Sequence, residues 1–284
     1  MPATASADTD ELSHKTFARF AEFITSELGI KMPESKLTMV QSRLLRRVRE
    51  LQLKSVEQYS EYFFTSANAE ERDHFINAIT TNKTDFFREA EHFDFLTRVV
   101  LPSLSRPAGR GSRVTVWSAG CSSGEEPYTL AMVLSEYALA QPGFDYAILG
   151  TDISTRVLNL AKEAIYQGSQ TATVPAELRR KYLWQGRDKS QSLVRVVPPL
   201  RQKVTFHRLN FMDANYGIRD MFDVVFFRNV LIYFDKPTQE AVIDKICRNL
   251  VPGGYFFAGH SESLAGLDTE LCCVRTAVFR KRVE

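Results

Sequence analysis

Hydrophobic residues in the first quarter of the chain recur at the spacing of amphipathic helices. Phe17, Phe20, Ala21 and Ile24 lie three or four residues apart, and the same period continues to about residue 63. No strand-like alternation interrupts it. We therefore predict a small all-helical domain over residues 11–80, preceded by a polar, disordered tail over residues 1–10.

Turn-forming residues at 80–84 separate this domain from another helical segment. Thr84 and Asp85 are typical of a helix start, and we predict a helix from there to about Val100. A loop by composition follows at residues 105–112. Composition alone favours a domain boundary in that loop.

Beyond residue 112, short apolar runs alternate with helical patterns. The predicted strands are residues 114–117, 146–149, 223–227 and 255–258. The predicted helices are residues 127–140, 156–164 and 238–250. Such alternation is typical of an α/β fold with a mostly parallel sheet covered on both faces, here closed by an antiparallel terminal strand at 273–279. Residues 166–205 do not fit it and predict a small antiparallel β insert.

The composition is that of an ordinary globular protein, with 44% hydrophobic and 25% charged residues. The first residues lack the apolar segment of a signal peptide, and no run approaches the ~18 apolar residues of a membrane span. The four cysteines and five histidines show no metal-ligand spacing, so we predict neither a metal site nor a disulfide framework. These features indicate a soluble, cytoplasmic protein.

A glycine-bearing turn lies between the strand at 114–117 and the helix after it. Gly120 and Gly124 would let the backbone approach a ligand at the carboxyl edge of the sheet. Their spacing is not the Gly-x-Gly-x-x-Gly of nicotinamide binders, and no P-loop Lys-Ser/Thr follows. The alternative is a purely structural turn.

Polar side chains also follow the later strands. Asp152 ends the second strand, where an acid can accept hydrogen bonds from both hydroxyls of a ribose; the alternative is that it caps the next helix. Asn210 and Asn229 lie near later strand ends. Asn229 stands between apolar runs, where a buried amide is costly unless it is hydrogen-bonded, and this favours a role in binding.

Four segments, in this order, resemble the CheR family of chemotaxis receptor methyltransferases, which esterify glutamates on bacterial chemoreceptors. They are residues 77–89 (NAITTNKTDFFRE), 116–128 (VWSAGCSSGEEPY), 227–235 (FRNVLIYFD) and 258–262 (AGHSE). The resemblance runs from about Phe17 to Phe279. It implies a class I methyltransferase fold, with S-adenosylmethionine as methyl donor and S-adenosylhomocysteine as product. It also moves the predicted domain boundary to Thr81, so that residues 81–284 form the methyltransferase domain.

Matched motif by motif, the resemblance implies which residues bind the cofactor. Asp152 would take the ribose. The other cofactor-binding residues would be Asn82, Thr84, Arg88, Glu126, Asn210, Phe211, Asn229 and Val230. No general base is required, because a glutamate with a pKa of ~4.3 is already ionised at pH 7. The enzyme would contribute orientation and the removal of water.

Arg88 and Tyr233 are the residues that we predict nearest to the transferred methyl. From the predicted helix, the Arg88 guanidinium would hold a carboxylate of the cofactor or of the incoming glutamate. Tyr233 would line the path of the methyl. The alternatives are a surface ion pair of Arg88 with Asp85 or Glu91, and a core role for Tyr233.

Positive charge is concentrated in one stretch of the helical domain. Residues 36–54 contain six Lys or Arg and one acid, which gives +5 and leaves −3 for the rest of a chain whose net charge is +2. Arg43, Arg46 and Arg49 share one helical face. The resemblance implies that this face docks onto the acidic helical bundle of a receptor; a merely solvated face is the alternative. We expect no nucleic acid partner, since no aromatics are interleaved.

The β insert raises a second question about partners. Some members of the family hold a C-terminal tether peptide of the receptor on this insert, and the strand at 193–197 is the edge that we predict for it. A purely structural insert is the alternative. We expect a monomer without membrane insertion. Two other functions stay open: a methyltransferase of the same fold with another substrate, and a receptor-binding adaptor without catalysis.

Overall fold

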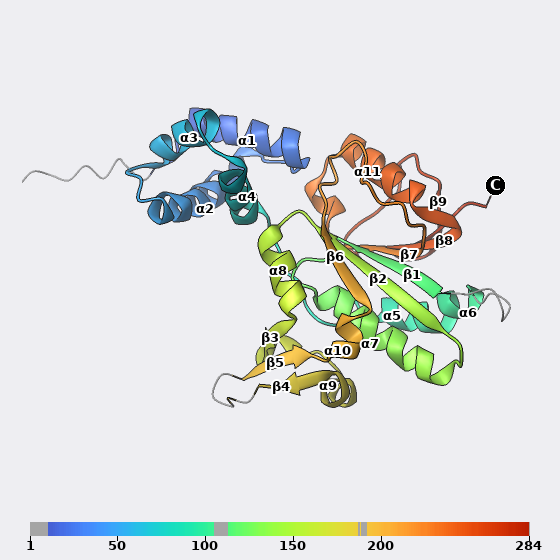
Figure 1. The fold of residues 1–284 in the computed structure, drawn as a ribbon. Helices are drawn as coiled ribbons and strands as arrows, with labels where there is room; N and C mark the ends of the chain where they lie inside the picture. The colour runs from blue at the N-terminus through green and yellow to red at the C-terminus, as the bar shows by residue number, and fades with distance from the viewer. Residues whose placement is uncertain (1–10, 105–112, 187, 189–191, 284) are drawn as a thin grey trace, which may run out of the picture. The chain divides into compact units, whose positions relative to one another are not determined.

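The structure, a computed structural model, describes residues 11–104, 113–186, 188 and 192–283 (Figure 1). It divides into two compact units, Met1–Thr81 and Asn82–Glu284. The predicted tail at 1–10 and the predicted loop at 105–112 lie outside the described residues. No helix in the described part of the chain is long and apolar enough to cross a membrane.

The first unit is helical, in agreement with the periodicity. Its helices are α1 (His14–Leu28), η1 (Glu34–Lys36), α2 (Leu37–Glu50), α3 (Val56–Thr65) and α4 (Ala69–Ile79). Side chains of Ser13, Ser55 and Asn68 cap α1, α3 and α4. The core is aromatic: Phe63 and Phe75 have ring centroids 4.5 Å apart, inside the apolar face that the spacing of residues predicts.

The second unit contains a seven-stranded sheet of order β6-β2-β1-β7-β8-β10-β9. The strands are β1 (Arg113–Ala119), β2 (Asp145–Asp152), β6 (Val204–Arg208), β7 (Phe222–Phe227), β8 (Leu250–Ala258), β9 (Leu271–Arg275) and β10 (Val278–Lys281). The first five in spatial order are parallel, while β10 pairs antiparallel with both β8 and β9. The prediction of a mostly parallel α/β sheet is confirmed. The single terminal strand predicted at 273–279 is in fact two strands.

Helices cover both faces of this sheet, with α11 over one face and α5, α6 and α7 beneath the other (Figure 1). The helices are α5 (Glu91–Phe95), η2 (Leu96–Val100), α6 (Leu101–Ser103), α7 (Glu125–Ala140), α8 (Thr155–Glu163), α10 (Pro198–Arg201), η5 (Leu231–Tyr233) and α11 (Lys236–Arg248). Strand β7 is buried along its whole length, as expected for a central parallel strand.

The insert is a separate three-stranded antiparallel sheet of order β3-β5-β4, built from β3 (Ile165–Gln167), β4 (Leu183–Gln185) and β5 (Leu193–Val196). It also holds η3 (Gly168–Thr171) and α9 (Ala176–Tyr182). The prediction that residues 193–197 form an exposed edge is wrong, because β5 pairs with strands on both sides. The edges are β3 and β4.

The helix predicted from residue 84 does not begin there. Residues 86–90 form turns, and α5 starts at Glu91. Phe87 and Glu89 have positive φ angles of 54° and 56°, which an α-helix cannot contain. Arg88 therefore lies in a turn between two left-handed residues, and not on a helix.

Candidate active site

The carboxyl ends of three neighbouring strands bring the polar segments together. In the parallel register, Ala119 of β1 lies beside Thr151 of β2, and Ser118 lies beside Phe226 of β7. The glycine turn after β1, Asp152 at the end of β2 and the segment after β7 consequently meet at one edge of the sheet. Open α/β sheets bind ligands at this edge.

The glycine turn is fixed by backbone bonds to β2. The N–H groups of Gly120 and Cys121 both donate to the carbonyl of Thr151, at 2.7 and 2.8 Å. Gly124 has a φ of 96°, and a Cβ there would lie 2.9 Å from both Ala161 Cβ and the Tyr166 hydroxyl. A side chain at Gly124 would therefore be strained and crowded.

Asp152 is 7% exposed, and both of its carboxylate oxygens accept backbone N–H groups. Ser122 N and Ser154 N each donate to it at 2.9 Å. Burial raises the pKa of Asp152, while these bonds and a weak attraction to Arg156 act in the opposite direction. The alternative role of Asp152 as cap of α8 is wrong, because the Ser154 side chain is the cap.

Asn82 lies against the same turn. Its backbone carbonyl accepts the Ser122 hydroxyl at 2.8 Å, and its side-chain oxygen accepts Arg156 Nη2 at 3.4 Å. Thr84, two residues further on, is half-buried. The structure thus places the start of the second unit beside the glycine turn and Asp152.

Glu126, in the first turn of α7, is 9% exposed. Its two oxygens accept the Ser118 hydroxyl at 2.6 Å and Arg228 Nε at 2.7 Å. Sequence reasoning missed Arg228, although a signal was present: it is the one charged residue between the apolar runs 224–227 and 230–234.

The Arg88 side chain is half-buried, and its Nη1 donates to the Lys83 carbonyl at 3.4 Å. The alternative ion pairs with Asp85 or Glu91 assumed helical spacing, which the turn at 86–90 removes. Glu91 instead pairs with His260 at 3.1 Å.

Asn229, two residues after β7, has a left-handed φ of 60°. Its backbone N donates to Glu262 Oε2 at 2.8 Å, and Gly259 N donates to the same oxygen at 2.6 Å. Val230 packs on the glycine turn, since a Cβ on Gly120 would lie 2.6 Å from Val230 Cγ2. Tyr233 ends the short η5 helix that follows, and is half-buried.

Asn210 and Phe211 follow β6 and also lie at the carboxyl edge of the sheet. Leu209 N donates to the Asp152 carbonyl at 3.0 Å, which ties this segment to β2. Asn210 Oδ1 accepts Met212 N at 3.0 Å. The Phe211 ring lies 4.9 Å from that of Phe227, at the end of β7.

One group of possible metal ligands occurs among the described residues. Ligand atoms of Glu89, His92 and His260 all lie within 4.8 Å of one another. The cation already present is Arg228, whose Nη1 lies 3.4 Å from Glu89 Oε2 and 3.3 Å from His92 Nδ1. Burial, Arg228 and His260 lower the pKa of His92 to about 3. A second cation here would be repelled by the guanidinium.

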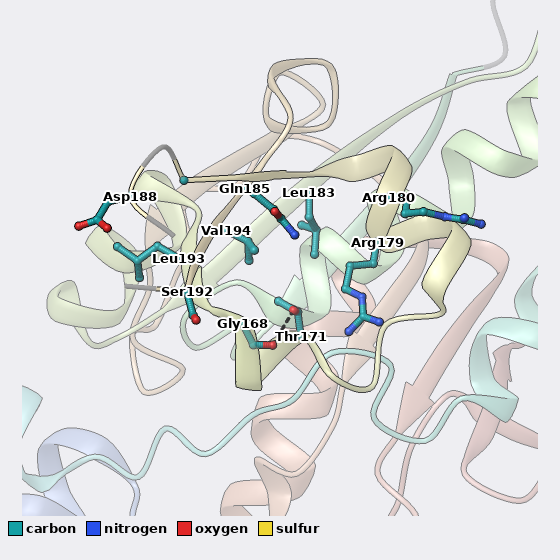
Figure 2. Close-up of a pocket in the computed structure, with 11 residues that line it drawn as sticks. Gly168, Thr171, Arg179, Arg180, Leu183, Gln185, Asp188, Ser192, Leu193 and Val194 are labelled. Atoms are coloured by element: carbon teal, nitrogen blue, oxygen red, sulfur yellow. Dashed lines mark hydrogen bonds between the residues drawn. The ribbon is translucent and has the colours of Figure 1, made fainter. Parts of the chain in front are cut away.

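The β insert carries a cavity of about 680 Å³ (Figure 2). It lies over β4 and β5, and the side chain of Arg179 from α9 points toward Thr171 while that of Arg180 points away. Asp188 and Ser192 stand at the hairpin end. The insert therefore offers a hollow with a cation at one end and an acid at the other.

The predicted docking arginines on α2 differ in exposure and in hydrogen bonding. Arg46 is 79% exposed and pairs with Glu50 at 3.0 Å, and Arg49 is exposed. Arg43 is half-buried, and its guanidinium donates to the Ile79 carbonyl and to Thr81 Oγ1. Arg43 thus stabilises the end of α4 within the same unit.

A mostly parallel sheet with a glycine turn after its first strand and a buried acid at the end of its second is the arrangement of class I methyltransferases. Residues 82–279 match the family model described as the CheR methyltransferase SAM binding domain, and residues 15–80 match its all-alpha domain. The chain belongs to the CheR methyltransferase family, and is a methyltransferase that depends on S-adenosylmethionine (SAM).

Several curated proteins are similar along nearly the whole chain. A chemotaxis protein methyltransferase of Borreliella burgdorferi is 37% identical over 275 residues, 96% of this chain and 94% of that protein. Chemotaxis protein methyltransferase 2 of Pseudomonas aeruginosa is 39% identical, over 88% of this chain and 87% of that protein. Among solved structures, a glycopeptide N-methyltransferase complexed with sinefungin aligns with a TM-score of 0.36 and 15% identity, over 62% of this chain and 50% of that one.

The residues at the sheet edge fit S-adenosylmethionine by their chemistry. Asp152 offers a carboxylate for a ribose diol, and Glu126 offers another for an ammonium group. Asn210 and Asn229 carry amides, which can pair with an adenine edge or with the polar end of an amino acid.

Proposed function

We propose that this protein transfers the methyl group of S-adenosylmethionine to glutamate side chains of bacterial chemoreceptors, giving glutamate methyl esters. The observation that carries the proposal is the similarity to chemotaxis protein methyltransferases over both units of the chain. The polar groups gathered around Asp152 and Glu126 support it. The reaction belongs in the cytoplasm, where the receptor's helical bundle and the cofactor are both present.

Bound S-adenosylmethionine supplies an electrophilic methyl on a sulfonium. The side chains of the protein then bind and orient. Asp152 holds the ribose, Glu126 holds the amino-acid end, and Asn82, which stands beside the glycine turn, contributes together with Thr84. The remaining cofactor contacts come from Asn210, Phe211, Asn229 and Val230.

Arg88 and Tyr233 act at the incoming carboxylate in this proposal. A glutamate is ionised at neutral pH and needs no base, so the barrier falls mainly through orientation and loss of water. The Arg88 guanidinium can hold a carboxylate by two parallel bonds. Its half-buried position reduces competition from solvent.

We also propose that the exposed arginines of α2 bind the acidic, glutamate-bearing bundle of the receptor. Arg46 and Arg49 are available for this. Arg43 contributes indirectly, by fixing the end of α4. Electrostatic complementarity would raise the association rate. Positive charge alone does not distinguish the receptor from other polyanions such as nucleic acids, so the shape of the bundle must add selectivity.

A second contact on the β insert would take an extended peptide from the receptor's C-terminus. Strand β4 lies at the edge of the described three-stranded sheet and carries Trp184, which is 58% exposed. The cavity of Figure 2 lies next to it and offers Arg179 to an acidic residue of the peptide.

The decisive experiment uses labelled S-adenosylmethionine with membranes that contain chemoreceptors. We expect label in the receptor that mild alkali releases as methanol, the behaviour of a carboxyl methyl ester. Arg88→Ala should abolish it, and Tyr233→Phe should lower kcat with little change in cofactor affinity. Alkali-stable label, or label on receptors whose acceptor glutamates are replaced by glutamine, would refute the proposal.

A further inference from the structure

Arg228 follows strand β7 directly, and its side chain is 3% exposed. Its Nε donates to Glu126 Oε2 at 2.7 Å, and its Nη1 donates to the backbone carbonyl of Arg88 at 2.7 Å. Nη1 also lies 3.3 Å from His92 Nδ1 and 3.4 Å from Glu89 Oε2. One guanidinium thus joins the end of a central strand, the first turn of α7 and the segment that carries Arg88.

The surroundings of Arg228 suit a buried guanidinium. A buried cation is stable only when it is paired and hydrogen-bonded, and Glu126 and Glu89 supply the opposite charges. The rings of Phe93 and Phe226 lie 5.4 and 5.5 Å from its Cζ. Since a guanidinium only donates, His92 Nδ1 accepts from it. A lysine ammonium lacks the planar fork that reaches these partners together.

The carbonyl that Arg228 holds belongs to a strained segment. Phe87 and Glu89 both have left-handed φ angles, 54° and 56°, and flank Arg88 on either side. Each costs free energy, and such conformations persist only where the surroundings enforce them. The bond from Arg228 is one enforcing contact. Another is the bond of Phe87 N to the Thr129 hydroxyl at 3.1 Å.

We propose that Arg228 is a positioning residue for methyl transfer, which fixes the Arg88 backbone and the Glu126 carboxylate relative to β7. Arg228 acts through the Arg88 carbonyl and the Glu126 carboxylate and does not itself contact the transferred methyl. The inference rests on the proposed function for its substrate, and on the contacts above for its geometry. It predicts that Arg228 and Arg88 work as one unit.

A double-mutant cycle in the full chain tests this coupling. Arg228→Lys should slow receptor methylation by about tenfold to a hundredfold, the effect of a small misplacement at a reacting centre, with the KM for receptor unchanged. Arg88→Lys should slow it as well. If Arg228 acts through Arg88, the double variant is no slower than the slower single variant. Multiplying effects would overturn the proposal. Arg248→Lys, at an exposed ion pair on α11, is the control and should keep full activity.

Amide hydrogen exchange gives a readout that needs no substrate. Exchange at residues 86–90 should rise in Arg228→Lys, while exchange in α11 should not. Unchanged exchange at 86–90 would overturn the proposal even if activity fell. Glu89→Gln weakens the same arrangement without removing the arginine, and should show a smaller rise at 86–90 if Arg228→Lys does not fold. A wild-type protein that methylates no receptor would refute the proposed function and leave the exchange result to decide on Arg228.

Discussion

At the scale of single residues, the carboxylates at the sheet edge accept hydrogen bonds from the protein itself. Both oxygens of Asp152 accept backbone N–H groups, and each oxygen of Glu126 accepts a side-chain donor. A carboxylate has about four lone-pair sites, so both groups retain acceptors for a ligand. The bonds inside the protein fix where those remaining acceptors point.

Asp152→Ala should weaken S-adenosylmethionine binding by about 1.5–3 kcal/mol, because hydrogen bonds to a charged acceptor are lost. Isothermal calorimetry on the folded variant measures the loss directly. Asp152→Asn is the matched control for the turn, since its amide oxygen can still accept an N–H from Ser122 or Ser154. Unchanged cofactor affinity in folded Asp152→Ala would remove Asp152 from the site.

His92 should make stability depend on pH. Its pKa is about 3 in the folded protein against 6.5 for the free side chain, so its contribution to the free energy of unfolding is fully present above pH 6.5. As the pH falls toward 3, His92 binds a proton in the unfolded chain but stays neutral in the folded protein. The free energy of unfolding then falls by up to about 1.4 kcal/mol per pH unit from this group. The His92→Gln variant lacks this pH-dependent contribution to the free energy of unfolding. Urea unfolding of both proteins between pH 7 and 4 should show their difference shrinking with acid, and parallel curves would contradict the assignment.

At the scale of elements, the insert is connected to the glycine turn and to the Arg88 segment. The Tyr166 hydroxyl on β3 donates to the Ser123 carbonyl at 2.8 Å, and its ring meets that of Phe86 at 4.9 Å. Thr173, beyond η3, donates to the Phe86 carbonyl at 2.7 Å. The insert therefore helps to hold the glycine turn and the segment before Arg88.

Tyr166→Phe should lower the affinity for S-adenosylmethionine by about 0.5–1.5 kcal/mol, the net value of one hydrogen bond, because the Ser123 carbonyl loses its donor. Tyr146→Phe is the matched control: it removes a buried hydroxyl bonded to Ala131 O at 3.0 Å, away from the turn. Calorimetry should show the loss in the first variant alone. Equal cofactor affinities in the two would mean that the insert does not position the turn.

The sequence predicted long periodic elements well and local details poorly. The helical unit and the β–α alternation follow from apolar spacing, which burial enforces everywhere along an element. The segment at 86–90 was wrongly predicted as helix, because residues distant in sequence bond it; one of them, Arg228, lies 140 residues away from Arg88. The three-residue β3 is too short to show a period, and a hairpin pattern cannot reveal that a third strand makes β5 central.

The candidate site divides in the same way. The resemblance implies roles for Glu126 and Arg88, which stand in the family's segments, and for Asp152, which its place at a strand end also singles out. Arg228 and Glu262 stand in such segments too, but no role could be read for them from the sequence, because both act by bonding other residues of the protein. Glu262 binds the backbone N–H groups of Asn229 and Gly259, and burial raises its pKa against these bonds. Only the folded arrangement shows such partners.

At the scale of the whole molecule, charge is divided between units. The arginines of the basic stretch lie on α2 in the first unit, while the residues proposed to bind the cofactor lie in the second. Within the first unit, the inward-facing Arg47 bonds Glu71 at 2.6 Å, so the exposed arginines of α2 are Arg46 and Arg49. A surface that serves docking should therefore affect receptor capture without affecting cofactor binding.

This division predicts how methylation responds to salt and to charge reversal. The apparent KM for receptor should rise with ionic strength, because the Debye length shortens from about 10 Å at 0.1 M to about 3 Å at 1 M. Arg46→Glu combined with Arg49→Glu should raise that KM already at low salt and flatten its salt dependence, while the affinity for S-adenosylmethionine stays that of the wild type.

Arg219→Glu with Arg248→Glu makes the same change of net charge in the second unit, at exposed residues, and should leave the KM nearly unchanged. If both pairs raise the KM equally, the receptor senses only net charge. If the α2 pair lowers cofactor affinity as well, the helical unit has misfolded, and melting curves would show it.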